Sequence, residues 1–255
     1  MQDWLDAILA ITEEAAALPQ TYFRQGVDVI QKADETPVTV ADREVESFLR
    51  AAIERHFPGH AIFGEEFGET GGDGPYRWII DPIDGTRSFI SGMPLFGMLV
   101  GLLEHGKPVL GTVRLPALGE VYYGSGAGAF DGAGQRLSTS KTASLDTAFL
   151  YINEADKILR AAPETFHRLN RAGKDRRFAY DCYPHALVAA GHVDACVDFD
   201  LQPYDYLPLV PVIEAAGGVI TDWRGERLAM QNDEAVVSAA TPALHAELIA
   251  LLNKD

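Results

Sequence analysis

The stretch WIIDPIDGT, residues 78–86, joins an apolar run to two aspartates. Pro82 lacks a backbone donor and keeps the residue before it extended, so we expect a strand that ends at Asp81. A sharp turn then carries Asp84 back toward the end of the strand. Two carboxylates and the carbonyl of Ile83 therefore converge on one point, as a hard divalent cation requires.

The same turn offers backbone amides as well as acids. The N–H groups of Gly85 and Thr86 are expected to receive a phosphate oxygen, as amides at a turn or a helix start commonly do. An Asp-x-x-Asp pattern alone more often marks a capped turn. Here a second acidic motif accompanies it, because Glu65 and Glu66 follow a predicted strand at 61–63 and are flanked by glycines. Acids at two strand ends favour a metal site over a solvated face.

The composition describes an ordinary globular chain with a large excess of acid. Of its 255 residues, 47% are apolar and 23% are charged, and the net charge is -16. This charge disfavours nucleic acid and anionic membrane as partners. The first residues lack a basic targeting segment and no apolar run approaches the roughly 20 residues that span a bilayer, so we expect a cytoplasmic protein. Cys182 and Cys196 are expected to be reduced and buried.

The hydrophobic pattern changes near residue 140. Before this point it predicts one helix over residues 3–31, with a break at Pro19, and another over residues 40–56. The strands of this part are expected to form one largely antiparallel sheet, and they fall at 61–63, 78–80, 95–103, 108–115 and 120–124, with a glycine-rich hairpin rim at 124–134.

Beyond residue 140, strands and helices alternate, which predicts a second α/β layer. Strands are expected at 149–152, 178–180, 194–199, 218–222 and 236–238. Helices are expected at 155–171, 184–191 and 205–216, and after Thr241, a favourable N-cap. We therefore predict an α/β (α+β) chain with an N-terminal lobe, residues 1–140, that holds most of the clustered acids, and a C-terminal lobe, residues 141–255.

Three motifs, taken together, are similar to those of the inositol monophosphatase superfamily. They are DPIDGT at 81–86, GEE at 64–66, and an acid, Asp205, ahead of AGG at 216–218. The resemblance spans about residues 32–223 and implies a layered αβαβα sandwich of the inositol monophosphatase and fructose-1,6-bisphosphatase type. It also implies a homodimeric phosphatase that uses two or three Mg²⁺ ions in each active site.

The resemblance also assigns roles by position. It implies that the metal ligands are Glu65, Asp81, the carbonyl of Ile83, Asp84 and Asp205. The ions would lower the pKa of a water molecule and stabilise the departing alkoxide. Glu65, Asp42 and Thr86 are then the catalytic residues, with Asp42 accepting a hydrogen bond from the Thr86 hydroxyl, which orients the attacking water. Taken alone, Asp42 is better explained as an acid that the helix dipole stabilises.

The segments around these motifs resemble the histidinol-phosphate phosphatase branch. The resembling segments are RSFISGMP at 87–94, DCY at 181–183 and PYDY at 203–206. The predicted substrate contacts are Arg87, Asp181 and Asp198. The two acids would bind the amine and the imidazole of histidinol phosphate. Asp198 stands where the family commonly has glutamate. The competing interpretations are a helix cap for Asp181 and a surface ion pair for Arg87, and His185 is expected either to touch the substrate or to pack.

Two other functions are compatible with the same motifs. The first keeps the chemistry and changes the small phosphorylated substrate to an inositol phosphate or a 3′-phosphorylated adenosine nucleotide, because the segment KADETP at 32–37 also resembles the nucleotide branch. The second is a non-enzymatic metal-binding scaffold that uses the same acids without catalysis.

Overall fold

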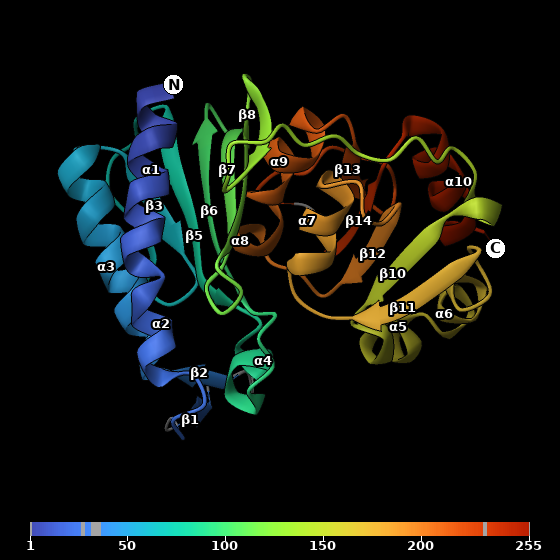
Figure 1. The fold of residues 1–255 in the computed structure, drawn as a ribbon, viewed down its shortest axis with the longest axis horizontal. Coiled ribbons are helices and arrows are strands. Elements are labelled where there is room, and N and C mark those ends of the chain that lie inside the picture. Colours follow the sequence, from blue (N-terminus) through green and yellow to red (C-terminus); the bar gives the residue numbers. More distant parts are fainter. Residues whose placement is uncertain (1, 27–28, 32–36, 232–233, 255) are drawn as a thin grey trace.

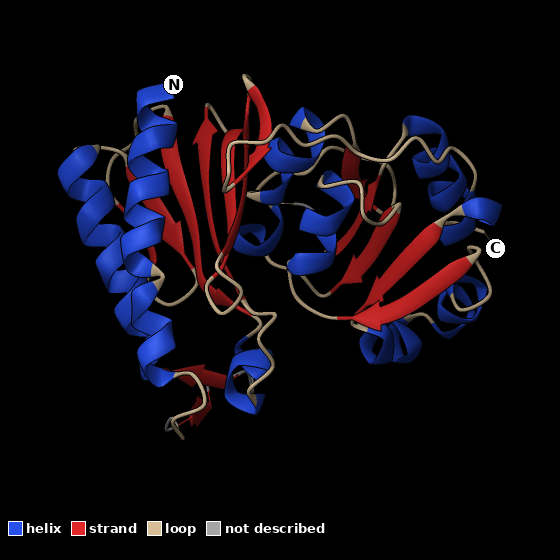
Figure 2. Cartoon of the chain, viewed as in Figure 1, coloured by secondary structure: helices blue, strands red, loops and turns tan. Residues whose placement is uncertain are grey.

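Helices and sheets alternate in five layers across the molecule (Figure 1). The computed structural model describes residues 2–26, 29–31, 37–231 and 234–254. The layers are, in order, α1 (Gln2–Ala15) and α3 (Val40–His56); a seven-stranded sheet; α7 (Tyr183–Ala189), α8 (Pro203–Tyr206) and α9 (Leu209–Ala215); a five-stranded sheet; and α5 (Ala155–Ala161), α6 (Pro163–Leu169) and α10 (Pro242–Leu252). Figure 2 shows the central helices lying between the two sheets. The predicted αβαβα sandwich is confirmed.

The first sheet is almost entirely antiparallel, as predicted, because only the β3–β5 pair runs parallel. Its strands are, in spatial order, β4 (Gly68–Thr70), β3 (Ala61–Gly64), β5 (Tyr76–Asp84), β6 (Gly97–Glu104), β7 (Lys107–Leu115), β8 (Glu120–Ser125) and β9 (Gly128–Asp131). The short edge strands β4 and β9 are missing from the sequence prediction. Strand β9 lies within the segment that was expected to form only a hairpin rim.

Strand β5 carries the segment that decides the fold. Trp78 and Ile80 face the core beneath α1 and α3, whereas Ile79 faces the core between the two sheets. Because both faces are covered, the strand is a continuous apolar run. The expected end at Asp81 is wrong, since β5 continues to Asp84 across a shift in register. Such an irregularity accommodates a proline, which has no N–H for the ladder.

The second sheet is mixed and follows the alternating part of the chain. Its strands are, in spatial order, β11 (Asp175–Ala179), β10 (Phe149–Asn153), β12 (Ala195–Phe199), β14 (Ala235–Ala239) and β13 (Val219–Asp222). Strands β10, β11 and β12 are parallel to one another. Their C-terminal ends therefore meet at one edge of the sheet.

Three predicted helices are divided near a proline, and the sequence predicted only the first of these breaks, the one at Pro19. The helix expected over 3–31 ends as α2 (Ala17–Tyr22), with a turn at Ala16, three residues before Pro19. A second break falls before Pro163, between α5 and α6, and a third falls before Leu209, between α8 and α9. A proline removes a helical hydrogen bond and collides with the preceding turn. It is tolerated only in the first turn, so the chain starts a new helix there.

Two further differences concern the start of the chain. Residues expected to be helical form β1 (Val29–Gln31), which pairs antiparallel with β2 (Pro37–Thr39). Residues 32–36 lie outside the described residues, so the segment KADETP at 32–37, which resembles the nucleotide branch, is described only at Pro37. The remaining short helices are α4 (Thr86–Ser91) and the 3₁₀ turn η1 (Leu145–Thr147).

A row of three glycines lets α8 and α9 approach the first sheet. Gly101, Gly111 and Gly124 are direct partners across β6, β7 and β8. A side chain on Gly111 would collide with the carbonyl of Pro208, and one on Gly124 would collide with the backbone at Pro211. The missing side chains thus make room for the backbone that carries Asp205.

The core between the two sheets draws residues from both predicted lobes. Val113 and Leu115 of β7 lie in the same apolar cluster as Leu209 and Ile213 of α9. The division of the chain near residue 140 stays a prediction. Within the described chain, no helix has the length and apolar character that crossing a bilayer requires.

Candidate active site

Three aspartates from distant parts of the chain meet at one place. Asp81 and Asp84 lie at the end of β5, and Asp205 lies in the first turn of α8. One carboxylate oxygen from each residue lies within 4.8 Å of the others, so that together they could hold a metal ion. Glu65 follows β3 directly, and its N–H donates to the Ile80 carbonyl at 3.2 Å. Its charge acts on both Asp81 and Asp205. The structure therefore brings the four predicted acids together.

Local hydrogen bonds fix the orientation of these acids. Asp81 Oδ1 accepts from the N–H of Ile83 at 3.0 Å. The carboxylate of Asp84 accepts from the N–H of Cys182, which lies just ahead of α7. Asp205 Oδ2 accepts from the N–H of Gln202 at 2.7 Å in a reciprocal cap of α8. Each carboxylate is thus held in place by a backbone amide.

The acid cluster is electrostatically strained. Burial raises the pKa of Asp81 well above its usual range, and the charges of Glu65, Asp84 and Asp205 raise it further. Burial likewise raises the pKa of Asp84, with Asp181 and Asp205 adding to the effect. The pKa of Asp205 is raised to about 7, chiefly by burial. Carboxylates this close repel one another, and bound cations remove that repulsion. The oxygen-only donor set fits a hard cation such as Mg²⁺.

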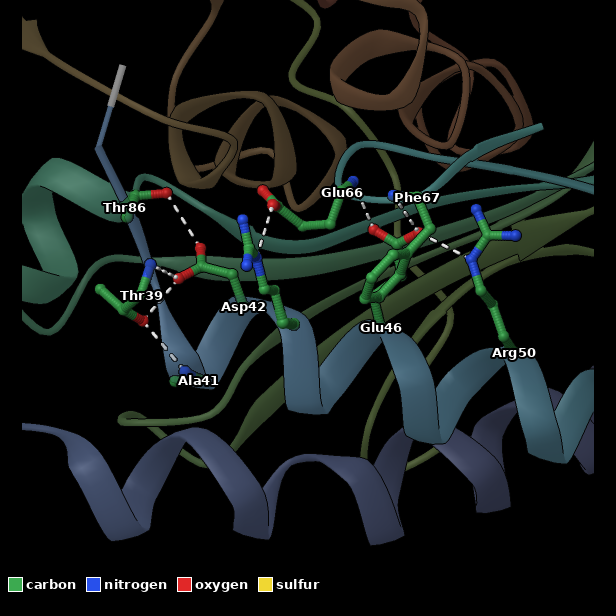
Figure 3. Close-up of polar contacts among 9 residues, drawn as sticks. Thr39, Ala41, Asp42, Glu46, Arg50, Glu66, Phe67 and Thr86 are labelled. Carbon is green, nitrogen blue, oxygen red and sulfur yellow. Dashed lines mark hydrogen bonds and ion pairs between the residues drawn. The ribbon is translucent and has the colours of Figure 1, made fainter. Parts of the chain in front are cut away.

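Thr86 connects the acid cluster to Asp42. The Thr86 hydroxyl donates to Asp42 Oδ1 at 3.1 Å, and it lies 3.3 Å from the carbonyl oxygen of Ile83 (Figure 3). Asp42 is fully buried, and its second oxygen accepts from the N–H of Thr39 at 2.7 Å. Thr39 is the N-cap of α3, so Asp42 closes a capping box while it holds Thr86. The hydrogen bond expected between Asp42 and Thr86 is present, and the alternative cap role is present with it.

The turn at Gly85 faces Asp181. Gly85 adopts a left-handed conformation, with φ of 89°, and a side chain there would collide with the Asp181 carboxylate. This position therefore requires glycine. Burial raises the pKa of Asp181 to about 6. The Asp181 carboxylate also accepts a hydrogen bond from the Ser88 hydroxyl. Asp181 thus lies beside the turn whose amides were expected to bind phosphate.

A buried ion pair that the sequence analysis missed holds the turn that carries Glu65. Arg50 Nε donates to Glu46 Oε1 at 2.7 Å, and both side chains are largely buried (Figure 3). The Glu46 carboxylate also accepts from the N–H groups of Glu66 and Phe67, at 2.7 Å and 3.2 Å. A Glu–Arg pair four residues apart usually marks a solvated helix face. The usable signal was its position beside the buried stripe formed by Val45, Leu49 and Ile53.

The predicted substrate residues differ in their surroundings. Arg87 is exposed on α4 and makes no ion pair with another described residue, so its contact with substrate stays a prediction. Asp198 is 1% exposed and accepts from the N–H of Phe199 at 2.8 Å. His185 packs, with Nε2 3.1 Å from Asp198 Oδ2. Cys182 and Cys196 are free and buried, as expected.

This fold and this site define a phosphatase, in which clustered carboxylates lie beside a glycine turn at the start of a helix. Comparison with known proteins gives the family. The whole chain, residues 1–255, matches the model of the inositol monophosphatase family, and the chain belongs to this family. It is accordingly a hydrolase of phosphate monoesters, as the sequence analysis predicted.

Relatives within the family carry different substrate names. The chain is 40% identical over 241 residues to the histidinol-phosphatase of Chlorobaculum parvum, covering 92% of this chain and 91% of that protein. It is 31% identical to the inositol-1-monophosphatase of Bacillus subtilis, covering 82% of this chain and 80% of that protein. The structure of an inositol monophosphatase from Zymomonas mobilis superimposes with a TM-score of 0.88, at 32% identity, over 98% of both chains.

Proposed function

We propose that this phosphatase hydrolyses histidinol phosphate with the help of Mg²⁺. The observation that supports this proposal is the position of Asp181, an acid directly beside the phosphate-binding turn at Gly85. An acid there would attract an ester whose alcohol carries an ammonium group. The neutral alcohol of a polyol phosphate would gain no such attraction. The 40% identity to a protein named histidinol-phosphatase points to the same substrate.

The proposed metal ligands are the four clustered acids and one carbonyl. They are Glu65, Asp81, the Ile83 carbonyl, Asp84 and Asp205. When bound, the cations neutralise the phosphate and make an attacking water more acidic. Without such charge the cluster would repel a phosphate dianion, since every side chain in it is acidic.

The remaining groups of the site bind and orient. The N–H groups of Gly85 and Thr86 open helix α4 and have no acceptor within that helix, so they are free to bind phosphate oxygens. The Thr86 hydroxyl donates to Asp42, so it can pass its own proton to that carboxylate as it takes a proton from the attacking water. Glu65, whose charge acts on Asp81 and Asp205, completes the proposed catalytic set.

A panel of three substrates tests this proposal. Phosphate release is measured from histidinol phosphate, inositol 1-phosphate and 3′-phosphoadenosine 5′-phosphate at equal concentrations, with and without Mg²⁺. We expect Mg²⁺-dependent release that is fastest from histidinol phosphate. A kcat/KM at least tenfold higher for either of the other esters overturns the proposed substrate but keeps the metal-dependent phosphatase.

The variant Asp84→Asn separates catalysis from a scaffold role. The substitution removes one charge from the cluster and should abolish turnover while the fold persists, because Asn retains an acceptor for the N–H of Cys182. Asp146→Asn, at an exposed acid of η1, is the matched control and should be fully active. Protein that binds Mg²⁺ but releases no phosphate from any of the three esters would support the scaffold instead. A homodimer in the cytoplasm completes the proposal.

A further inference from the structure

Asn153, the last residue of β10, connects the two acids that were predicted to contact the substrate. Its side chain is fully buried. Nδ2 donates to the backbone carbonyl of Asp181 at 2.9 Å and to Asp198 Oδ2 at 2.6 Å. Both partners are acceptors only, so the amide is held in one orientation, since a rotation by 180° would place its oxygen against two oxygens.

Asp198 has no free hydrogen-bonding capacity toward a ligand on the same oxygen. Oδ2 also lies 3.1 Å from His185 Nε2, and the other ring nitrogen of His185 lies 2.8 Å from the hydroxyl of Ser238. Because the carboxylate can only accept, Nε2 carries a proton, and Nδ1 is engaged with the Ser238 hydroxyl. Hydrogen bonds therefore join four buried side chains in a row, which we call the relay: Ser238, His185, Asp198 and Asn153.

This relay explains a cluster that resembles a metal site. His185, Cys196 and Asp198 are buried and offer ligand atoms within 4.8 Å of one another. Both ring nitrogens of His185 are already engaged in hydrogen bonds, however. Binding a metal would require His185 to give up one of these hydrogen bonds. We therefore interpret His185 as a residue that positions Asp198 and, through it, Asn153.

The relay ends in an acceptor without a partner. Asn153 Oδ1 is buried and makes no hydrogen bond with any described residue. A buried acceptor that is left unpaired destabilises the folded state. Two neighbours of Asn153 have strained backbones as well. Glu154, the next residue in the chain, and Asp181, which accepts from the Asn153 side chain, are non-glycine residues with φ of 47° and 65°. Strain of this kind concentrates at ligand sites. A donor that arrives with the substrate would satisfy the free oxygen.

We propose that Asn153 is a specificity-determining residue whose side-chain oxygen accepts a hydrogen bond from an N–H group of the leaving alcohol. Its amide N–H groups keep Asp181 and Asp198 in place at the same time. Asp198 is then a positioning residue that acts through Asn153, in place of the direct contact expected from the sequence. This inference rests on the proposed function, since it requires an amino alcohol as the leaving group.

The test measures binding of the alcohol apart from turnover of its ester. The probe reaction is hydrolysis of p-nitrophenyl phosphate, which has no N–H donor, and the inhibitors are histidinol and inorganic phosphate. We expect Asn153→Ala to weaken inhibition by histidinol at least tenfold. The inhibition constant of phosphate should stay within about twofold of wild type, and the kcat for p-nitrophenyl phosphate is measured alongside it to report whether the site as a whole is intact. Equal inhibition by histidinol of variant and wild type overturns the inference, as does a loss of all three properties together.

Two further variants keep the test decisive. Asn153→Ser is read in the same assay if the alanine variant does not fold, because its hydroxyl can still donate while its short side chain withdraws the acceptor. Thr221→Val is the matched control: Thr221 forms a buried pair with His245, at 2.8 Å, that resembles the pair of Ser238 and His185. It should leave inhibition by histidinol unchanged, and a tenfold change there also overturns the inference.

The wild-type protein separates this inference from the proposed function. Wild-type protein that hydrolyses p-nitrophenyl phosphate but not histidinol phosphate rejects the proposed substrate, and the inference with it. Wild-type protein that hydrolyses histidinol phosphate but is not inhibited by histidinol rejects the inference alone. Wild-type protein that is inhibited, with Asn153→Ala inhibited equally, rejects the inference alone.

Discussion

Thr86 lies between the acid cluster and Asp42, and its hydroxyl is the feature that the proposed catalysis requires. Thr86→Val keeps the shape of the side chain and removes the hydrogen bond to Asp42. We expect kcat to fall by about 10²-fold or more, the range typical of lost proton transfer. Thr86→Ser retains a hydroxyl and should stay within about tenfold of wild type. Steady-state kinetics at saturating Mg²⁺ give both values, and equal losses in the two variants would show that the hydroxyl has no catalytic role.

Some residues of the site were predictable from local sequence and others were not. Asp81, Asp84 and Gly85 belong to one short motif, where the proline and the glycine report the backbone geometry directly. Asn153 gives no such signal, because a single asparagine at the end of a strand is a common turn residue. Its importance depends on two partners from β12 and the segment before α7, which only the folded chain brings within hydrogen-bonding distance.

Helix α3 contributes to the site through Glu46 as well as Asp42. Glu46→Gln leaves one acceptor oxygen where Arg50 and the N–H groups of Glu66 and Phe67 now share two. We expect the free energy of unfolding to fall by about 2 kcal/mol, since one buried donor loses its partner. The turn that carries Glu65 should loosen, so Mg²⁺ affinity should fall too.

Urea denaturation and calorimetric titration with Mg²⁺ measure these two effects of Glu46→Gln. Glu44→Gln is the control, because Glu44 is exposed on the same helix and accepts from the hydroxyl of Tyr22, away from Arg50. Wild-type stability in Glu46→Gln would show that the buried ion pair does not hold this turn.

The glycine row makes a prediction about strand β7. In Gly111→Ala the new methyl group collides with the carbonyl of Pro208, so the helices behind it must shift. We expect a loss of stability of about 1–3 kcal/mol, as in other overpacked cores, and weaker Mg²⁺ binding through the displaced Asp205. Gly126→Ala has open space around it and should change stability by less than about 0.5 kcal/mol. Urea denaturation compares the two, and similar stabilities would contradict the close approach.

The predicted boundaries of helices and strands are wrong where two local sequence signals point to different structures. Apolar residues recur at helical spacing over residues 155–171, which predicted one helix. Pro163 instead starts a second helix within this segment. Residues 29–31 were assigned to a helix, and pairing with Pro37–Thr39 makes them a strand. Tertiary pairing decides such short segments more than propensity does. The register that aligns Gly101, Gly111 and Gly124 was equally out of reach, because it depends on two hairpins at once.

The stability of the whole molecule should depend on pH in a way that Mg²⁺ reverses. Burial raises the pKa of Asp181 to about 6 and that of Asp205 to about 7. A carboxyl group with a raised pKa stabilises the fold while it is protonated, and this contribution is lost as the pH rises through the folded-state pKa. In chelator, we therefore expect Tm to fall as the pH rises from about 5 to about 8.

Added Mg²⁺ should restore the stability lost in that range, because it binds the ionised acids. The increase in Tm on adding Mg²⁺ is therefore expected to be larger at pH 8 than at pH 5.5, and thermal melts at both values measure it. Asp205→Asn should flatten the pH dependence in chelator. An Mg²⁺ effect that is the same at both pH values would contradict the assignment of these acids to the cations.

The layered architecture follows from the sequence better than its details do. The sequence has a run of strands before residue 140 and alternating strands and helices after it. This pattern predicts two sheets, and helices must then cover the faces that remain. The sequence alone did not reveal that α7, α8 and α9 share one core with the first sheet. That shared core brings Asp205 to the end of β5.

The central claim is that Glu65, Asp81, Asp84 and Asp205 together bind the divalent cations of the reaction. Anomalous scattering from crystals soaked in Mn²⁺, a substitute for Mg²⁺, locates the ions directly. We predict strong peaks between these four side chains, and their loss in Asp84→Asn. Peaks elsewhere in the molecule, with none at the four acids, would contradict the account.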